Sequence, residues 1–357
     1  MKVCILGNGL ISLTLAKALV NQGLNVDIIS SRKKYNFNKV QTLGISKSNS
    51  DFFNKNILHI KKYLWDIDEI EIYDELLQNE KILNFENNGK RLFSVVKNYQ
   101  MIKYLLSSLK KNKLLKFKKK VDINNIDKFK YKLIINCEHD NLITKKYFYK
   151  KLDKNYLGYA HTTILKHQKV SKNNTAYQIF TKLGPIAFLP ISPKETSVVY
   201  SIKGKKEVDL KNLIKKYNRR YEILKIERPI CFELKSLNLR KYYFKNILAF
   251  GDLLHRLHPL AGQGFNMSLR DIKVIIDLIK FKIDHGLELD ENVCIEFEKK
   301  TRHKNFIFSS GIDFIYEYFN FESKVNNNIF GKSVQLLGKN KIVNNFFKKI
   351  ADSGIII

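Results

Sequence analysis

The sequence predicts an α/β fold in which a parallel sheet is interrupted by an antiparallel layer and followed by a helical C-terminal region. Residues 2–30 have the pattern strand, turn, helix, strand, a βαβ unit whose two strands must be parallel. Residues 158–202 alternate apolar and polar side chains, as half-buried antiparallel strands do. Residues 263–285 place apolar side chains at helical spacing, which predicts a long amphipathic helix.

The βαβ unit contains a glycine turn, GNGLIS, between its first strand and its helix. This is the GxGxxG pattern with Ser12 in the third place, where only a small residue is needed for helix packing. Gly7 permits the tight turn, and Gly9 lets the backbone approach a pyrophosphate. The first N–H groups of the helix, at Leu10 and Ile11, would stabilise that anion. The pattern predicts a Rossmann-like dinucleotide site; the alternative is a glycine turn without a ligand.

A chain of 357 residues is long for one core, and the order of the patterns divides it. The expected segments are 1–150 for the first part of the nucleotide-binding domain, 151–244 for an antiparallel substrate domain, 245–290 for the second part of the nucleotide-binding domain, and 291–357 for a helical region. Buried strand patterns at 133–135 and 247–250 place both flanking segments in one parallel sheet.

The net charge of +30 raises the question of a polyanionic partner. The lysines are spread along the whole chain without a nucleic-acid-binding motif, so biased composition explains them better, and we expect no nucleic-acid partner. Weak attraction to an anionic membrane surface would be a by-product. No apolar run reaches the roughly 20 residues that span a bilayer, and the N-terminus has no signal-peptide pattern. We expect a cytoplasmic protein, with contact to the inner face of the membrane left open.

The segment 251–271, GDLLHRLHPLAGQGFNMSLRD, is far more specific than the glycine turn. A strand ends in Gly251 and Asp252, which places a carboxylate at the carboxyl edge of the sheet, where α/β proteins bind ligands. Gly262 and Gly264 then leave backbone N–H groups unobstructed at the positive end of the next helix. Such a site suits a ring that becomes anionic.

Metal binding is the competing interpretation of His255 and His258, which stand three residues apart. Asp252 is the nearby acid, and the surrounding proline and glycines favour structural or ring-edge roles for both histidines. The four cysteines are far apart and form no CxxC pair. We therefore expect no metal site.

The same segment closely resembles the motif GDAAHxxHPxAGQGxNxGxxD of the FAD-dependent aromatic hydroxylases of the p-hydroxybenzoate-hydroxylase class, in particular the ubiquinone-biosynthesis hydroxylases. The matching residues are Gly251, Asp252, His255, His258, Pro259, Ala261, Gly262, Gln263, Gly264, Asn266 and Asp271. Residues 184–191, GPIAFLPI, resemble the family's GPxAxLP strand, and Asn98 fits the stretch before the next helix. The resemblance covers residues 1–290 and implies a FAD-binding Rossmann-like sheet with an inserted substrate layer.

The resemblance also implies where FAD would bind. Asp252 would hydrogen-bond the ribityl chain, while Pro259 and His258 would lie near the reactive edge of the flavin. The backbone of residues 262–266 would stabilise negative charge on the reduced ring. The implied cofactor-binding residues are Gly7, Gly9, Leu10, Ile11, Ser30, Gln41, Asn98, Gly251, Asp252, Pro259, Ala261, Gly262, Gln263, Gly264, Phe265 and Asn266. No catalytic side chain is implied, because the flavin carries the chemistry.

Three positions depart from the family pattern. Ser30 stands where the family has Glu, Gln41 where it has Arg, and Cys137-Glu138 where it has an Asp-Gly pair. All three lie on the nucleotide side of the implied cofactor site, whereas the motif for the flavin ring is intact. They motivate an alternative, in which the chain is a non-catalytic flavin-fold scaffold subunit of a quinone-biosynthesis complex.

The primary hypothesis is a FAD-dependent monooxygenase that uses NAD(P)H and O2 to hydroxylate an electron-rich aromatic ring. By resemblance, the substrate is a polyprenyl phenol of ubiquinone biosynthesis. The basic stretch 344–350, NNFFKKI, is consistent with a helix that lies on the membrane where such a substrate resides. It is equally consistent with a helix packed against the rest of the protein.

Overall fold

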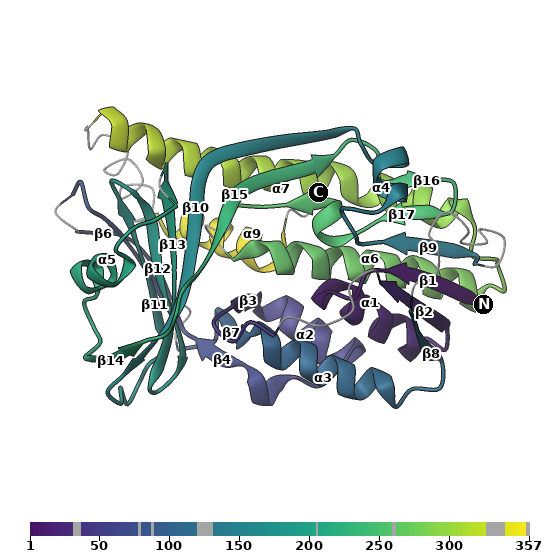
Figure 1. Ribbon diagram of the computed structural model, residues 1–357, viewed down its shortest axis with the longest axis horizontal. Helices are drawn as coiled ribbons and strands as arrows, with labels where there is room; N and C mark the ends of the chain where they lie inside the picture. Colours follow the sequence, from purple (N-terminus) through teal and green to yellow (C-terminus); the bar gives the residue numbers. More distant parts are fainter. Residues whose placement is uncertain are drawn as a thin grey trace.

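Two sheets lie at opposite ends of the long axis of the molecule, with long helices between and above them (Figure 1). The computed structural model describes residues 1–30, 37–77, 80–86, 89–119, 131–204, 206–258, 262–325 and 340–354. The predicted α/β fold, with its antiparallel layer and helical C-terminal region, is confirmed.

The first sheet has six strands in the order β16-β17-β9-β1-β2-β8. They are β1 (Lys2–Leu6), β2 (Asn25–Ser30), β8 (Leu115–Lys119), β9 (Leu133–Asn136), β16 (Tyr243–Phe244) and β17 (Ile247–Ala249). Every neighbouring pair is parallel except the edge pair β16 and β17. The carboxyl ends of β17, β9, β1 and β2 therefore meet at one edge of the sheet, where ligands bind in such folds.

The second sheet has nine strands and is mostly antiparallel. Its strands are β5 (Glu69–Asp74), β6 (Glu80–Glu86), β10 (Lys151–His167), β11 (Thr175–Thr181), β12 (Gly184–Ser192), β13 (Glu195–Lys203), β14 (Ile223–Ile226), β15 (Ile230–Leu239) and β18 (His255–Arg256). Strands β5 and β6 join this sheet through a parallel pair between β5 and β11, so the layer draws on more of the chain than residues 151–244. Their charged residues, which alternate with apolar ones, gave no sign of that partner.

Smaller elements connect the two sheets. A three-stranded sheet contains β3 (Thr42–Ser46), β7 (Phe93–Lys97) and β4 (Trp65–Ile67). The remaining elements outside the long helices are α1 (Leu10–Asn21), α2 (Lys47–Asn56), η1 (Lys61–Tyr63), α3 (Asn98–Lys110), α4 (Leu142–Tyr147), α5 (Leu210–Tyr217) and η3 (Gly251–Leu253). Helix α5 lies against the far side of the antiparallel sheet (Figure 1).

Helix α6 (Gln263–Asp284) confirms the amphipathic helix expected at 263–285. It packs against α1 and against α7 (Glu291–Val325), and its apolar face is buried. The buried apolar residues of this face include Leu269, Ile272, Ile275, Ile276 and Ile279. Burial of each such side chain contributes about 1.5–3 kcal/mol, so packing rather than helix propensity holds α6 in place.

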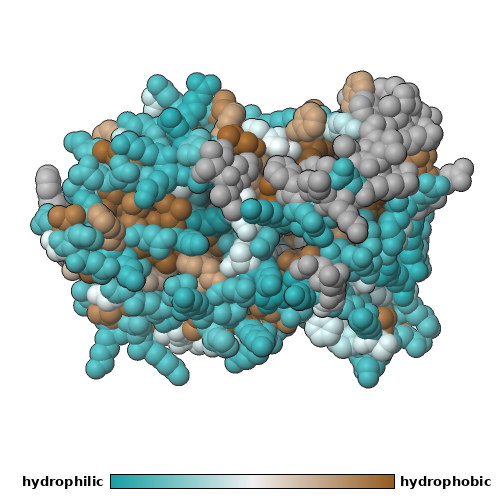
Figure 2. Space-filling model, turned by 180° about the vertical axis from the view of Figure 1, so that it is seen from behind, coloured by the Kyte–Doolittle hydropathy of each residue, from teal (hydrophilic) through white to brown (hydrophobic). Residues whose placement is uncertain are grey.

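Helix α9 (Lys341–Ser353) packs on α2 and β3 and also contacts the antiparallel sheet. The side chains of Asn344 and Lys348 donate hydrogen bonds to the carbonyls of Asn84 and Glu86 in β6, and Ile350 packs beside α7. For the stretch 344–350 the structure thus supports the packed helix. The face of the molecule in Figure 2 is mostly hydrophilic, with apolar residues gathered in a few patches. No helix in the described ranges is long and apolar enough to cross a bilayer.

Gly184 begins β12 at a point where no side chain fits. Its φ is +130°, and a Cβ there would lie 2.2 Å from the carbonyl oxygen of Ser201 in the neighbouring strand β13. Gly204 also has a positive φ, +81°, but a Cβ at that position would meet nothing within 4 Å.

We expect Gly184→Ala to lower the free energy of unfolding by about 3 kcal/mol or more, because the methyl group adds a backbone collision to an unfavourable φ. Gly204→Ala is the matched control and isolates the cost of the φ angle, which is about 1–2 kcal/mol. Urea unfolding of both variants measures the difference. Equal destabilisation of the two variants would contradict the collision.

Candidate active site

A cavity of about 1990 Å³ lies where the carboxyl edge of the parallel sheet faces the antiparallel sheet. Its walls come from the turn after β1, from β3, from the loop after β9, from η3 and the start of α6, and from β5, β6, β11, β12, α7 and α9. Pockets for one drug-sized ligand have roughly 300–1,000 Å³, so this cavity has room for a dinucleotide and a second molecule.

The start of α1 forms one end of the cavity. Gly7 has φ +115°. The N-cap of α1 is Gly9, which has no side chain to cap the first N–H groups of the helix. A Cβ at Gly9 would meet nothing within 4 Å. The first N–H groups of the helix therefore face open space on the cavity wall, and with the helix dipole they suit the negative charge of a pyrophosphate.

The start of α6 forms a second helix N-terminus on the same cavity. Its N-cap Gly262 has the left-handed φ of +58° and makes no side-chain capping hydrogen bond. A Cβ at Gly264 would meet nothing within 4 Å. A flat ring can thus approach the backbone here, and the positive end of the helix favours negative charge on it.

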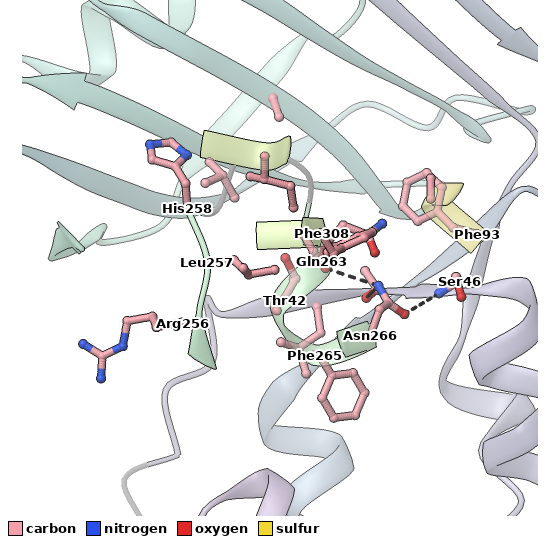
Figure 3. A pocket seen from close by; sticks show the side chains of 18 of the residues that line it. Thr42, Ser46, Phe93, Arg256, Leu257, His258, Gln263, Phe265, Asn266 and Phe308 are labelled. Atoms are coloured by element: carbon pink, nitrogen blue, oxygen red, sulfur yellow. Dashed lines mark hydrogen bonds between the residues drawn. The ribbon is translucent and has the colours of Figure 1, made fainter. Parts of the chain in front are cut away.

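Asn266 holds this second helix start in position (Figure 3). Its Oδ1 accepts a hydrogen bond of 2.8 Å from the backbone N–H of Ser46, and its Nδ2 donates to the carbonyls of Gly44 at 3.1 Å and Gly262 at 3.3 Å. Ser46 is also the N-cap of α2. The side chain of Asn266 is therefore used within the protein, and it ties the first turn of α6 to β3 and α2.

Two buried amide oxygens on the cavity wall, Gln263 Oε1 and Asn98 Oδ1, have no hydrogen-bond partner among the described residues. Asn98 Nδ2 points to Gln41 Oε1 at 3.4 Å, so two positions that are 57 residues apart in the sequence form one polar spot. Buried polar atoms are nearly always hydrogen bonded in folded proteins. Together with the two uncapped helix starts, these atoms fit a dinucleotide carrying a polar ring.

The two histidines of the glycine-rich motif have different surroundings. His255 Nε2 lies 2.5 Å from Asp271 Oδ2, and both side chains are fully buried. Asn305 Nδ2 donates to the other oxygen of Asp271 at 3.0 Å. His255 thus ties β18 to α6 and α7, which fixes the loop that leads to the start of α6.

His258 packs between aromatic rings at the end of the same loop. Its ring lies 4.9 Å from the ring of Tyr156, edge-on, and 4.2 Å from the ring of Tyr316. Burial lowers the pKa of His258 to about 3, so the imidazole is neutral at pH 7. The residue therefore offers a neutral hydrogen-bonding group on the cavity wall (Figure 3).

The half of the cavity that faces the antiparallel sheet is lined mainly by apolar side chains. They include Ile70, Ile72, Leu83, Phe85, Ala176, Phe180, Pro185, Ala187 and Leu189 from the sheet, and Ile307, Phe308, Ile312 and Ile315 from α7. The stretch GPIAFLPI, which resembles the family's GPxAxLP strand, lies in β12 and contributes Pro185, Ala187 and Leu189 to this wall. The contribution of α7 was not predicted, because an apolar stripe on a helix is also what core packing requires.

Most of the predicted site residues lie together. Gly7, Gly9, Leu10, Ile11, Gln41, Asn98, Gly251, Asp252, His258, Gly262, Gln263, Gly264, Phe265 and Asn266 all line the cavity. Pro259 and Ala261 fall outside the described residues. Ser30 is not part of the cavity wall. Its hydroxyl donates a 3.1 Å hydrogen bond to Glu138, and Glu138 does line the cavity. Glu138 was noticed in the sequence only as a departure from a motif.

Solved structures with this architecture include a monooxygenase and a protein solved with FAD. Over 99% of its length the chain matches p-nitrophenol 4-monooxygenase PnpA from Pseudomonas putida DLL-E4, with a TM-score of 0.77, 12% identity and 98% of that chain covered. It matches Klebsiella pneumoniae HpxO, solved with FAD and uric acid, with a TM-score of 0.76, 11% identity, and 99% and 97% of the two chains covered. The chain therefore has the fold of the FAD-dependent aromatic monooxygenases.

Sequence relatives are more specific. The chain is 23% identical over 274 residues to the mitochondrial ubiquinone biosynthesis monooxygenase COQ6 of Schizosaccharomyces pombe, which covers 63% of this chain and 57% of that protein. It is 28% identical over 156 residues to 3-demethoxyubiquinol 3-hydroxylase of Escherichia coli, covering 41% and 40%. The chain thus spans about half the length of these relatives. No family model matches it. The resemblance drawn from the glycine-rich motif is confirmed.

The buried, neutral state of His258 predicts a pH effect on stability. Its pKa is about 3 in the folded chain and roughly 6.5 when unfolded, so between these values the unfolded chain binds more protons. The contribution is complete above the unfolded pKa and is lost as the pH falls toward 3. We expect His258→Gln to flatten the slope of unfolding free energy against pH between about 6.5 and 3, measured by urea unfolding. Parallel slopes for wild type and variant would contradict a neutral buried imidazole.

Proposed function

We propose that the protein is a FAD-dependent monooxygenase that hydroxylates an aromatic ring, with a polyprenyl phenol of ubiquinone biosynthesis as its substrate. The observation that carries the proposal is the pair of uncapped helix starts, at Gly9 and Gly262, on one cavity that continues into an apolar half. The named relatives support the reaction class and the pathway.

The residues proposed to hold FAD are those implied by the motif. Gly7, Gly9, Leu10 and Ile11 would meet the pyrophosphate, Gln41 and Asn98 the middle of the cofactor, and Gly251 and Asp252 the ribityl chain. The backbone from Gly262 to Asn266, with Gln263, Gly264 and Phe265, would meet the ring. Bound FAD, reduced by NAD(P)H, supplies the activation of O2, from which one oxygen atom enters the substrate and the other leaves as water.

The protein itself contributes electrostatic stabilisation of the ring, exclusion of water and a neutral hydrogen-bonding side chain. The positive end of α6 stabilises negative charge that develops on the ring. Apolar walls on β5, β11, β12 and α7 exclude water from the reacting atoms. His258, neutral at pH 7, provides a group that can donate or accept one hydrogen bond near the ring edge without adding charge.

The shape of the apolar half supports a substrate with a hydrocarbon tail. The wall from α7 includes Ile307, Phe314 and Ile315, whose side chains are also 39–68% exposed, so the apolar surface extends from the interior to the cavity mouth. Burial of each tail methylene contributes about 0.8 kcal/mol. We infer that the tail leaves the cavity along α7, and that the mouth approaches the inner face of a membrane, since the net charge of +30 favours anionic lipid.

Purified protein is expected to bind added FAD and, given NAD(P)H, O2 and a short-chain prenyl phenol, to form a product one oxygen atom heavier, detected by mass spectrometry. NAD(P)H oxidation should rise when the phenol is added. The same mixture without the phenol is the control for uncoupled oxidation.

If the chain is instead a non-catalytic scaffold subunit, the same experiment is expected to give the opposite result. A colourless protein that binds no added FAD and oxidises no NAD(P)H would exclude the enzyme. Metabolite profiling of a deletion strain then adds the pathway, since loss of the hydroxylase should accumulate an under-hydroxylated quinone precursor.

A further inference from the structure

The end of β2 lacks the acid that usually binds a ribose in dinucleotide folds. Such folds place a carboxylate at the end of the second strand, because two acceptor oxygens can take hydrogen bonds from both ribose hydroxyls. Here β2 ends at Ser30, whose single oxygen does not offer two separate acceptor atoms to the two ribose hydroxyls. An adenosine ribose held only by Ser30 would be weakly fixed.

Glu138 brings a carboxylate to the same place from a different strand. Strands β9, β1 and β2 are consecutive parallel neighbours, so their carboxyl ends lie side by side. Glu138 follows the end of β9 by two residues, and its side chain crosses Gly7, the first residue after β1. It reaches Ser30, whose Oγ donates a 3.1 Å hydrogen bond to Glu138 Oε1.

Gly7 makes this crossing possible. A Cβ on Gly7 would lie 3.2 Å from Glu138 Cγ and 3.1 Å from Ser12 Oγ, which is tighter than nearly all real contacts of this kind. The glycine that opens the turn for a pyrophosphate therefore also opens the path along which the Glu138 side chain runs.

The backbone of Glu138 is fixed by a buried polar network. Its N–H donates to Asn136 Oδ1 at 3.1 Å, and its carbonyl accepts from Thr144 Oγ1 at 2.5 Å. Asn141, the N-cap of α4, donates from Nδ2 to Asn136 Oδ1 at 2.7 Å and accepts from the Thr144 N–H at 2.8 Å. A side chain whose backbone is fixed in this way is preorganised for a ligand.

The carboxylate is available on the cavity wall. Among the described residues, Ser30 is the side chain that donates to it, and no cation pairs with it. The neighbouring His139 lies 3.1 Å from Arg256 and does not turn toward it. Glu138 thus keeps acceptor capacity facing the space next to the start of α1.

We propose that Glu138 replaces the missing acid of β2 and binds the ribose hydroxyls of the adenosine half of FAD, with Ser30 orienting it. The inference rests on the proposed function, since FAD is the ligand. It implies that adenosine recognition is preserved although Ser30 stands where the family has Glu. The carboxylate comes instead from the loop after β9.

The test compares equilibrium binding of FAD and of an analogue lacking the 2′-hydroxyl of the adenosine ribose, by flavin fluorescence, in full-length wild type and in Glu138→Gln. Wild type is expected to bind FAD about 10- to 100-fold more tightly than the analogue, as for a hydrogen bond to a charged group. Glu138→Gln is expected to lose most of that preference, because it weakens the binding of FAD more than the binding of the analogue.

Asp140→Asn removes an acid of the same loop and is the matched control, expected to keep the wild-type preference. The double variant Ser30→Glu with Glu138→Gln returns the acid to β2 and is expected to restore it. An unchanged preference in Glu138→Gln would overturn the inference while leaving FAD binding intact. Failure of the wild type to bind FAD would instead overturn the proposed function, and the inference with it.

Discussion

The hydrogen bonds of one buried amide, Asn266, decide where the start of α6 lies, and the candidate site depends on that placement. The side chain connects Gly262, the N-cap of α6, with Gly44 in β3 and with Ser46, the N-cap of α2. Because this one group is shared between α6 and the adjacent elements β3 and α2, which are about 220 residues away in the sequence, the start of α6 cannot shift without breaking several bonds. A helix N-terminus stabilises charge only within its first turn, so this rigidity matters for any ring bound there.

The two lobes around the site are joined by continuous backbone. Strand β10 is 17 residues long, pairs with β15 between residues 151 and 162 and with β13 between residues 158 and 166, and crosses from one lobe to the other (Figure 1). Helix α9 adds a second connection, since it contacts α2, β3 and the carbonyls of β6. The apolar wall and the polar, helix-lined wall of the cavity are thereby held at a fixed separation, which is what positioning a substrate against a bound ring requires.

Local patterns predicted the elements well and their partners less well. The βαβ opening, the antiparallel run and the long helix at 263–285 each have a periodicity that the sequence shows directly, and the structure has all three. The union of β5 and β6 with the antiparallel sheet depends on a parallel pairing with β11, about a hundred residues away in the chain, which no local pattern encodes. The motif residues at 251–258 and 262–266 could be placed because glycine positions reflect backbone geometry. Glu138 could not, since its relation to Ser30 exists only once β9, β1 and β2 lie side by side.

The proposed function requires one FAD molecule to span the starts of α1 and α6. Titration of the wild type and of Gly9→Val with FAD and with FMN tests it most directly, because a Cβ at Gly9 would point into the cavity with nothing within 4 Å. We expect the wild type to bind FAD at least about tenfold more tightly than FMN, and Gly9→Val to lose this advantage while its unfolding free energy falls by no more than about 1 kcal/mol, the cost of a poorer N-cap. Equal affinity for FAD and FMN in the wild type, or no binding of either, would contradict it.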